Sequence, residues 1–468
     1  MPLVVTIVKA SIKADSSGAR LELPALITPA GVLEPLLDYF ISRAHDRSVQ
    51  WMRGVARAVR MFLEYLSTNP SERDNYRLFL NFGQRLYTGT YDRNTGQDPS
   101  GLGWMPMSAG RARKVVSALN DFFDYLSQTR PAAAFFNPKY AGSSYDRLID
   151  EAAYQYRRDK AFLGHTWASS LDAVNSSPGR LFRPRRRVSV EASEPPAFPD
   201  EHFERLIAEG FRVGNRYDYR NILITLLLHC AGFRESEPFH LYVSDVMPDP
   251  SNSKSALVLI HHPTEGTAPG DWFDEKDGRR KGTRRAYLQE RWGLMPRNEI
   301  LGYHHAGWKG GAHEENLGSL YFRAYWFEPW WGELFLAVWY KYLGEIALFE
   351  RKHPFAFVNT DRHPIGQPYA LAQFNKAHAR AVRRIGLEVS KEAGTTPHGH
   401  RHAYGRRLSS AAVPRELIRR FMHHSSLSSQ EPYTTPSLAA ALQALATASQ
   451  RLEATAISRR NLLSVFNP

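Results

Sequence analysis

The sequence is poor in cysteine, with Cys230 the only one among 468 residues. A single cysteine cannot form an intramolecular disulfide, which excludes a disulfide-stabilised scaffold and favours a reducing compartment. Long apolar runs are also absent: residues 222–230 have only the length of a core helix, so we expect a buried structural thiol at Cys230 and no membrane span. The apolar residues at the N-terminus are too few for a secretory signal, and we expect a cytoplasmic protein.

Acidic residues are outnumbered by basic ones. The chain has 47 Asp and Glu against 60 Lys and Arg, a formal net charge of +13 and an isoelectric point of about 9.7. This balance favours a polyanionic partner, and nucleic acid is the first candidate. Charge alone leaves open a generally basic soluble protein or one that touches an anionic membrane surface.

The length of the chain and its 43% hydrophobic content are sufficient for two or three folded domains. The first 30 residues alternate apolar and polar side chains, which predicts a strand or hairpin. Apolar residues recur with helical spacing at 51–66 and 111–126, which predicts a small helical bundle. We therefore divide the first part into an N-terminal extension (1–30), a helical domain (31–130) and a linker region that is basic and proline-rich toward its end (131–198).

The second part of the chain regains regular periodicity. We expect a folded domain at 199–440 and a C-terminal helix and tail at 441–468. The apolar run at 256–260 predicts a strand, and residues 285–288 are its possible hairpin partner. Insertions into this domain are expected near residues 247–278 and 290–350, and the tryptophans in the latter suggest core packing or a partner-binding addition.

Several polar residues of the second part suit the cleavage of a phosphodiester. Such a reaction needs a nucleophile, fixed donors for the charge that builds on the non-bridging oxygens, and a proton for the departing oxygen. Arginine suits the second task because its planar fork binds two oxygens and stays protonated, and Arg234 and Arg401 are candidates. His398 stands three residues before Arg401, and His424 precedes the candidate nucleophile Tyr433 by nine positions.

These motifs closely resemble those of the tyrosine recombinase (phage integrase) family. Gly232-Phe-Arg-Glu-Ser-Glu237 is similar to the first arginine box, and His398-Gly-His-Arg-His402 to the His-x-x-Arg box. The stretch from His424 to Tyr433 has the spacing of the family's His-to-Tyr box, and residues 281–284 resemble its β-hairpin lysine turn. Any one of these motifs is weak evidence alone, but four motifs in the family order are strong evidence. The resemblance covers roughly residues 200–440, and a weaker resemblance covers residues 30–130.

The resemblance implies a role for each matching residue. Tyr433 would attack the DNA and form a 3′-phosphotyrosyl bond, while Arg234, Arg401 and His424 would stabilise the pentacoordinate phosphorane. His398 would accept the tyrosine proton. Two further roles complete the set: Lys281 would protonate the leaving 5′ oxygen, and Glu237 would orient neighbouring groups. No metal or other cofactor is implied.

The chain departs from the family pattern at several places. His423 stands where a glycine usually precedes the second histidine, and Pro432 directly precedes Tyr433. The gaps on both sides of Lys281 are long, and Lys276 is an alternative lysine in the same stretch; Arg280 and Arg284 are close by.

The resemblance implies a mainly α fold: an N-terminal helical core-binding (SAM-like) domain that clasps DNA, and a mixed α/β, mostly helical catalytic domain with a small antiparallel sheet. The implied enzyme is a site-specific recombinase of a mobile element, acting on double-stranded DNA in the bacterial cytoplasm. It would work on DNA as a homo-tetramer, with possible accessory or partner recombinase proteins. No association with a membrane is implied. Candidate DNA-contacting residues are Arg53, Arg57, Arg111, Lys114, Arg185 and Arg186.

Three alternatives stay open. The same chemistry serves telomere resolvases and type IB topoisomerases, and a catalytically silent relative would bind DNA without cutting it. The histidines at 398, 400 and 402 raise the possibility of a zinc-dependent nuclease, but no cysteine is near and no usual ligand spacing is present.

Overall fold

The computed structural model describes residues 4–13, 20–92, 94–130, 136–140, 144–160, 179–185, 195–274, 278–279, 282–316, 318–361, 363–411 and 413–425. The chain divides into two compact units, Met1–Ser189 and Val190–Pro468. Each is built around its own hydrophobic core, and each is described by itself below.

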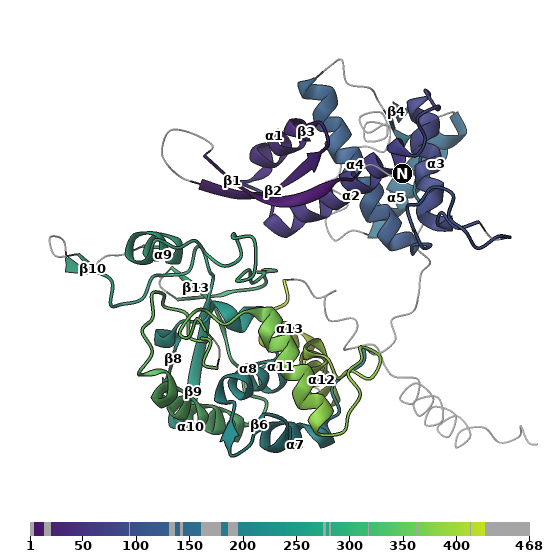
Figure 1. Cartoon of the computed structure of the whole chain (residues 1–468). Helices are drawn as coiled ribbons and strands as arrows, with labels where there is room; N and C mark the ends of the chain where they lie inside the picture. The colour runs from purple at the N-terminus through teal and green to yellow at the C-terminus, as the bar shows by residue number, and fades with distance from the viewer. Residues whose placement is uncertain are drawn as a thin grey trace, which may run out of the picture. The chain divides into compact units, whose positions relative to one another are not determined.

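The N-terminal unit combines a small sheet with a helical bundle. Its elements are β1 (Thr6–Lys13), β2 (Arg20–Thr28), β3 (Gly31–Val32), α1 (Glu34–Arg43), α2 (Val49–Ser67), α3 (Asn75–Thr88), α4 (Ala109–Thr129), β4 (Lys139–Tyr140), α5 (Ser144–Lys160) and β5 (Gly179–Arg180). Strands β1 and β2 pair antiparallel from Thr6 opposite Ile27 to Lys13 opposite Arg20, which confirms the expected hairpin. The sheet lies beside α1 and α2 (Figure 1). The helices expected at 51–66 and 111–126 are confirmed as α2 and α4.

Helix α2 shows why this sequence forms a bundle. It begins at Ser48, whose side chain accepts a hydrogen bond from the Trp51 backbone N–H at 3.2 Å and so caps the first turn. Its apolar stripe includes Val55 and Phe62, both buried. Phe62 packs edge-to-face on Phe79 of α3 with ring centroids 5.6 Å apart, so aromatic contacts join the helices of the bundle.

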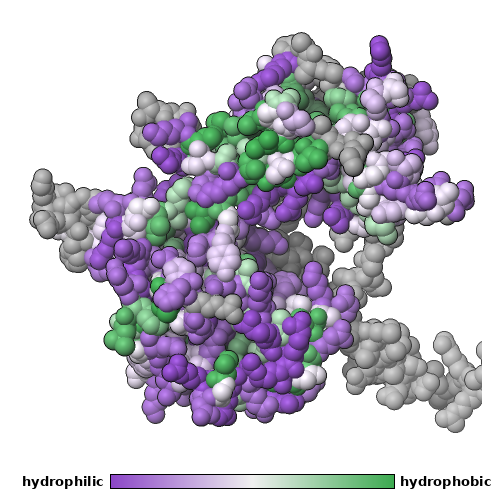
Figure 2. Space-filling model, in the orientation of Figure 1, coloured by the Kyte–Doolittle hydropathy of each residue, from purple (hydrophilic) through white to green (hydrophobic). Residues whose placement is uncertain are grey.

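The surface of the N-terminal unit carries apolar side chains over α1 and the sheet, as Figure 2 shows on the face in view. Ile27 of β2 and Val32 of β3 are among the exposed apolar residues. Elsewhere this face is largely hydrophilic, in keeping with the excess of basic residues.

The C-terminal unit is mainly helical around a four-stranded sheet. Its helices are α7 (Phe203–Arg205), α8 (Tyr219–Cys230), α9 (Arg284–Trp292), α10 (Pro329–Ile346), α11 (Leu371–Arg384), α12 (Pro397–Ser410) and α13 (Arg415–Phe421), with shorter turns η2 (Asp200–His202), η3 (Leu206–Gly210), η4 (Glu237–His240) and η5 (Val243–Asp245). Its strands are β6 (Arg212–Val213), β7 (Arg216–Tyr217), β8 (Val246–Asp249), β9 (Asn252–His261), β10 (Phe273–Asp274), β11 (Gly278–Arg279), β12 (Glu314–Asn316) and β13 (Ser319–Arg323). The main sheet has the antiparallel order β12-β13-β9-β8. The expected fold class, mainly helical with small antiparallel sheets, is confirmed.

One expected strand is a helix. Residues 285–288 were predicted as a hairpin partner of β9, but they lie in α9, and β9 pairs with β8 and β13 instead. Thr283 caps α9 by accepting the Ala286 backbone N–H at 3.3 Å. Arg284 is buried in an ion pair with Asp245 of η5, with Nη1 donating to Oδ2 at 2.8 Å, and this contact fixes the start of the helix.

Helix α8 is the centre of the C-terminal core. Its residues from Arg220 to Cys230 are all buried, and α10, α11 and α12 pack against it (Figure 1). Cys230 has no exposed surface, as expected, and burial raises the pKa of its thiol well above the usual value. No helix in the described part of the chain combines the length and the apolar character needed to cross a bilayer.

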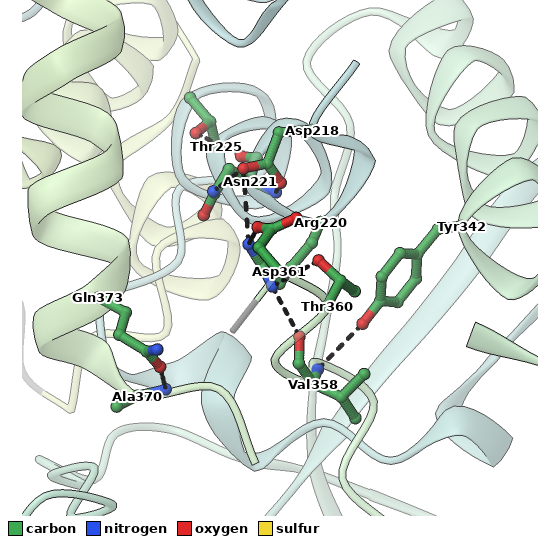
Figure 3. A network of polar contacts seen from close by, with 10 residues as sticks. All are labelled: Asp218, Arg220, Asn221, Thr225, Tyr342, Val358, Thr360, Asp361, Ala370 and Gln373. Atoms are coloured by element: carbon green, nitrogen blue, oxygen red, sulfur yellow. Dashed lines mark hydrogen bonds and ion pairs between the residues drawn. The ribbon is translucent and has the colours of Figure 1, made fainter. Parts of the chain in front are cut away.

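A polar network ties the start of α8 to the segment before α11 (Figure 3). The Arg220 guanidinium donates to the Val358 carbonyl at 2.8 Å and to Asp361 at 3.2 Å, and it lies 3.8 Å from the centre of the Tyr369 ring. The Tyr342 hydroxyl of α10 accepts the Val358 N–H at 3.0 Å. These bonds fix α8 at its first turn, while its last turn leads into the candidate site.

Candidate active site

The loop after α8 carries the first arginine box. Gly232 adopts φ +70°, and a Cβ at this position would lie 2.3 Å from the Tyr404 ring, so only glycine fits this turn. Arg234 follows, with its side chain partly exposed. Its Nη1 donates to Glu237 Oε1 at 2.7 Å and to the Gly310 carbonyl at 3.0 Å, and its backbone N–H donates to Glu237 Oε2 at 2.7 Å. The buried Glu237 carboxylate therefore fixes both ends of Arg234.

Arg401 joins three separate segments of the site. It lies on the first turns of α12, a helix that has Pro397 at its first position. One guanidinium nitrogen donates to the Gly232 carbonyl in the loop of Arg234, and the other donates to the Met422 carbonyl at 2.7 Å, two residues before His424. Because Arg401 is buried, these two bonds draw Arg234, His424 and α12 around one point.

His398 lies on the same first turn of α12, with its ring edge-to-face against His402 at a centroid distance of 4.4 Å. Burial lowers the pKa of His398, and the positive charges of Arg401, Lys309, Arg234 and Lys391 lower it further. A neutral imidazole at pH 7 can accept a proton, which is what the expected role of His398 requires.

His424 follows the end of α13. Burial lowers the pKa of His424 to about 3, with further contributions from Arg401, Arg234 and Lys309. Its neighbour His423, which stands where the family usually has glycine, adopts φ +53°. The His423 ring stacks on Phe322 at a centroid distance of 4.4 Å, and its Nε2 lies 3.0 Å from the Arg323 carbonyl. These contacts hold a non-glycine residue in the left-handed conformation, at the position that directs His424.

Lys309, which the sequence motifs do not single out, belongs to a loop that is bound to the site. It belongs to the loop 307–313, in the connection between β9 and β13 that also contains Lys281. The loop is bound to the first arginine box, because Ser236 Oγ donates to the Gly307 carbonyl at 2.6 Å and Arg234 donates to Gly310. The Lys309 charge is among those that lower the pKa values of both His398 and His424. The position of this loop follows from the two hydrogen bonds to Gly307 and Gly310, which join residues far apart in the sequence.

Three expected residues lie outside the described part of the chain: Tyr433, Lys281 and Arg186. Arg284, which was considered near the lysine, is a buried partner of Asp245. His400, part of the same histidine cluster, is fully buried behind the site. Within the described residues, no three His, Cys, Asp or Glu side chains are placed to share a metal ion.

The remaining candidates lie on the N-terminal unit. Arg57 of α2 and Arg111 and Lys114 of α4 line a groove of about 1170 Å³ between these helices and the segment before α4. Arg53 is partly exposed on α2, and Arg185 lies with its guanidinium 4.6 Å from the centre of the Tyr87 ring. The groove also contains apolar side chains, so it offers both charge and contact area.

The described site is an arginine-rich, positively charged centre with two histidines whose pKa values are lowered. Arg401 is hydrogen-bonded to the loop that carries Arg234 and to the turn before His424. An arginine-rich centre of this kind suits the binding of a phosphate group and the stabilisation of additional negative charge on its oxygens.

The model of the phage integrase family matches residues 334–439 of the chain. That segment contains His398, Arg401, His424 and Tyr433, whereas Arg234 precedes it. A search of curated proteins found no matching relative.

Similar solved structures include a pre-cleavage complex of XerH site-specific recombinase bound to difH substrate, at 14% identity over 87% of this chain and 83% of that chain, with a TM-score of 0.45. A Tn1549 transposon integrase with circular intermediate DNA is 13% identical over 83% of this chain and 99% of that chain, with a TM-score of 0.34. A lambda integrase dimer bound to a COC′ core site is 12% identical over 86% and 95%, with a TM-score of 0.36. All three TM-scores are below 0.5, so among these comparisons only the family-model match bears on the function.

Proposed function

From the phage integrase domain at residues 334–439, we propose that this chain is a site-specific tyrosine recombinase, an enzyme that cleaves and rejoins DNA strands through a 3′-phosphotyrosyl intermediate. The observation that carries the proposal is the pair of hydrogen bonds from Arg401 to the Gly232 and Met422 carbonyls. They join the loop of Arg234, the first turns of α12 and the turn before His424, three segments that are far apart in the sequence.

In the proposed reaction, the Tyr433 hydroxyl attacks phosphorus and the 5′ oxygen leaves. His398, held neutral by burial and nearby positive charges, accepts the phenol proton. Arg234, Arg401 and His424 donate hydrogen bonds to the non-bridging oxygens as their charge increases. Glu237 acts on Arg234 by fixing its guanidinium.

The proposed proton donor to the leaving oxygen is a lysine, and three lysines lie in the β9–β13 connection: Lys276, Lys281 and Lys309. We favour Lys309 over Lys281, because the Lys309 charge acts on both His398 and His424 and its loop is bound to Arg234 and Ser236. A lysine ammonium can protonate the 5′ oxygen as it departs.

Replacing Lys309 by alanine is expected to slow strand cleavage by about a hundredfold, the usual loss of one general acid. A substrate with sulfur in place of the leaving 5′ oxygen should restore the rate, because a thiol of pKa about 8.5 leaves without a proton. Lys391→Ala is the matched control, since Lys391 also acts on His398 but is not among the charges that act on His424. If sulfur instead rescued Lys281→Ala and left Lys309→Ala slow, Lys281 would be the acid.

The proposed partner is double-stranded DNA. On the N-terminal unit, the groove between α2 and α4 presents Arg57, Arg111 and Lys114, and basic side chains of this kind bind phosphates irrespective of sequence. Exchange of both strands between two duplexes breaks four phosphodiester bonds. With one nucleophile per chain, we propose an assembly of four copies on paired sites, for the integration or excision of a mobile element.

Covalent trapping tests the proposed function. Wild type and Tyr433→Phe are incubated, in EDTA, with nicked duplexes taken from the flanks of the host element. Wild type is expected to give an SDS-resistant protein–DNA adduct and Tyr433→Phe none, because the variant lacks the attacking oxygen. Tyr340→Phe, at an exposed position of α10, is the control and should give the wild-type adduct. An adduct with Tyr433→Phe would assign the nucleophile elsewhere, and loss of the adduct in EDTA alone would indicate a metal-dependent nuclease.

A further inference from the structure

Three buried histidines form a hydrogen-bonded chain directly behind the candidate site. His400 of α12 lies between His229, on the last turn of α8, and His378 of α11. His229 Nδ1 is 3.0 Å from His400 Nδ1, and His400 Nε2 is 2.7 Å from His378 Nε2. All three are almost completely buried, and burial lowers their pKa values, to about 3 for His378, so they are neutral at pH 7.

Arg407 sets the direction of this chain. Its Nη1 lies 2.7 Å from His229 Nε2 and also donates to Asp200, and its other terminal nitrogen donates to the His229 carbonyl. Because a guanidinium can only donate, His229 Nε2 must accept, although Asp200 Oδ1 is 3.2 Å away. A neutral His229 therefore carries its proton on Nδ1 and donates it to His400 Nδ1.

The remaining protons follow in order. His400 accepts at Nδ1, so its proton is on Nε2 and is donated to His378 Nε2. His378 must then carry its proton on Nδ1, which is buried and has no hydrogen-bond acceptor among the described residues. Every donor in the chain points from Arg407 toward α11, and a reversed chain would set a histidine N–H against an arginine N–H.

The histidine chain connects the end of α8, which precedes Arg234, to the first turn of α12, which carries Arg401. His229 precedes Arg234 by five residues at the end of α8, and His400 lies between His398 and Arg401 on α12. The segment that enters the unit packs on the same rings: Phe198 stacks on His400 at 4.2 Å and donates its backbone N–H to the Gly399 carbonyl at 3.0 Å, and Phe203 stacks on His229 at 3.5 Å. These contacts and the histidine chain together fix the first turn of α12.

We infer that His229, His400 and His378 are positioning residues for strand cleavage: their directional hydrogen bonds set the placement of His398 and Arg401 relative to Arg234. This inference rests on the proposed recombinase function. The groups that face His400 are His229, His378 and Arg407, and Asp200 acts through Arg407 and His229.

Because the hydrogen bonds of the three histidines have one direction, two variants of His400 can test them. His400→Gln keeps one acceptor and one donor on the same side chain, so the amide oxygen can accept from His229 and the amide nitrogen can donate to His378. His400→Leu keeps the bulk and removes both. At saturating DNA, we expect His400→Leu to slow formation of the covalent adduct about tenfold or more, and His400→Gln to stay within about threefold of wild type. The dissociation constant for DNA should be unchanged in both.

A second measurement on the wild-type chain needs no activity. Nitrogen-15 NMR of histidine-labelled protein at pH 7 is expected to show protonated Nδ1 for His229 and His378 and protonated Nε2 for His400. If the wild-type protein formed no adduct, the proposed function would be overturned. The NMR tautomers would then still test the direction of the histidine hydrogen bonds. A normal cleavage rate for folded His400→Leu, or the opposite tautomers, would overturn the inference.

Discussion

Arg401→Lys is expected to abolish most strand cleavage while leaving the chain folded. The wild-type guanidinium donates from two nitrogens to two carbonyls on different segments, Gly232 and Met422. A lysine has one ammonium group and cannot take both positions at the same time as it contacts a phosphate oxygen. The loop of Arg234 and the turn before His424 would then lose their common point of attachment.

The expected loss is about a hundredfold to a thousandfold in the rate of adduct formation, the usual effect of removing one fixed donor to a developing oxyanion. Stability should also fall, by about 1–3 kcal/mol, because a buried carbonyl is left without its donor. Calorimetry on the full chain gives the second quantity, and the covalent-trapping assay gives the first.

Arg406→Lys is the matched control for this experiment. Arg406 is exposed on the same helix and has one long contact, 3.4 Å to the Pro195 carbonyl, so its replacement should alter neither rate nor stability measurably. An Arg401→Lys protein that cleaves within a few-fold of wild type would show that the double attachment of Arg401 is dispensable and would remove the main support for the assembled site.

The helices of the N-terminal unit could be predicted from the sequence because each depends on residues close in the chain. The apolar stripe of α2 and the spacing of His398 and Arg401 on α12 are local patterns. The strand expected at 285–288 was wrong for the converse reason: its structure depends on the ion pair of Arg284 with Asp245, 39 residues away. A four-residue apolar pattern does not contain that information.

The same reasoning applies to the site. The position of the loop that carries Lys309 could not be predicted from the sequence, because it depends on hydrogen bonds that join residues 71 and 76 positions apart. The histidine chain joins residues 171 and 22 positions apart. His423, in contrast, was visible as a departure from the family glycine, and its positive φ explains why glycine is usual there.

The two stretches expected as insertions contribute to the core of the C-terminal unit. Strand β9 lies within 247–278, and α10 lies within 290–350 with Phe335 and Trp339 buried in the main core. These two stretches contain none of the family motifs, but their apolar residues pack against α8 and the sheet. The long β9–β13 connection brings the loop of Lys309 to the site.

Acidification is expected to unfold the C-terminal unit by about pH 5. All but two of the 18 histidines, His45 and His165, lie in this unit. Five of them have at most 2% of their surface exposed, and burial lowers their pKa values well below the usual 6.5; these are His229, His240, His378, His400 and His423. For His240 and His378, the pKa is lowered to about 3.

The sign follows from proton uptake. Below pH 6.5 the unfolded chain binds protons at these histidines and the folded chain does not, so stability is complete above pH 6.5 and is lost as the pH falls toward 3. Each group contributes about 1.4 kcal/mol per pH unit, and five together remove about 7 kcal/mol per unit. Because a domain is stable by only about 5–15 kcal/mol, one to two pH units suffice.

Circular dichroism and calorimetry of the full chain between pH 7.5 and 4.5 would measure this effect. His240→Phe replaces a buried histidine that packs against Trp308, and it should move the midpoint to lower pH because one proton fewer is taken up on unfolding. His45→Gln, at an exposed position of the N-terminal unit, should leave the midpoint unchanged. A C-terminal unit that stayed folded to pH 4.5 would contradict this prediction, because the cost of keeping these histidines unprotonated would then be smaller than the stability of the unit.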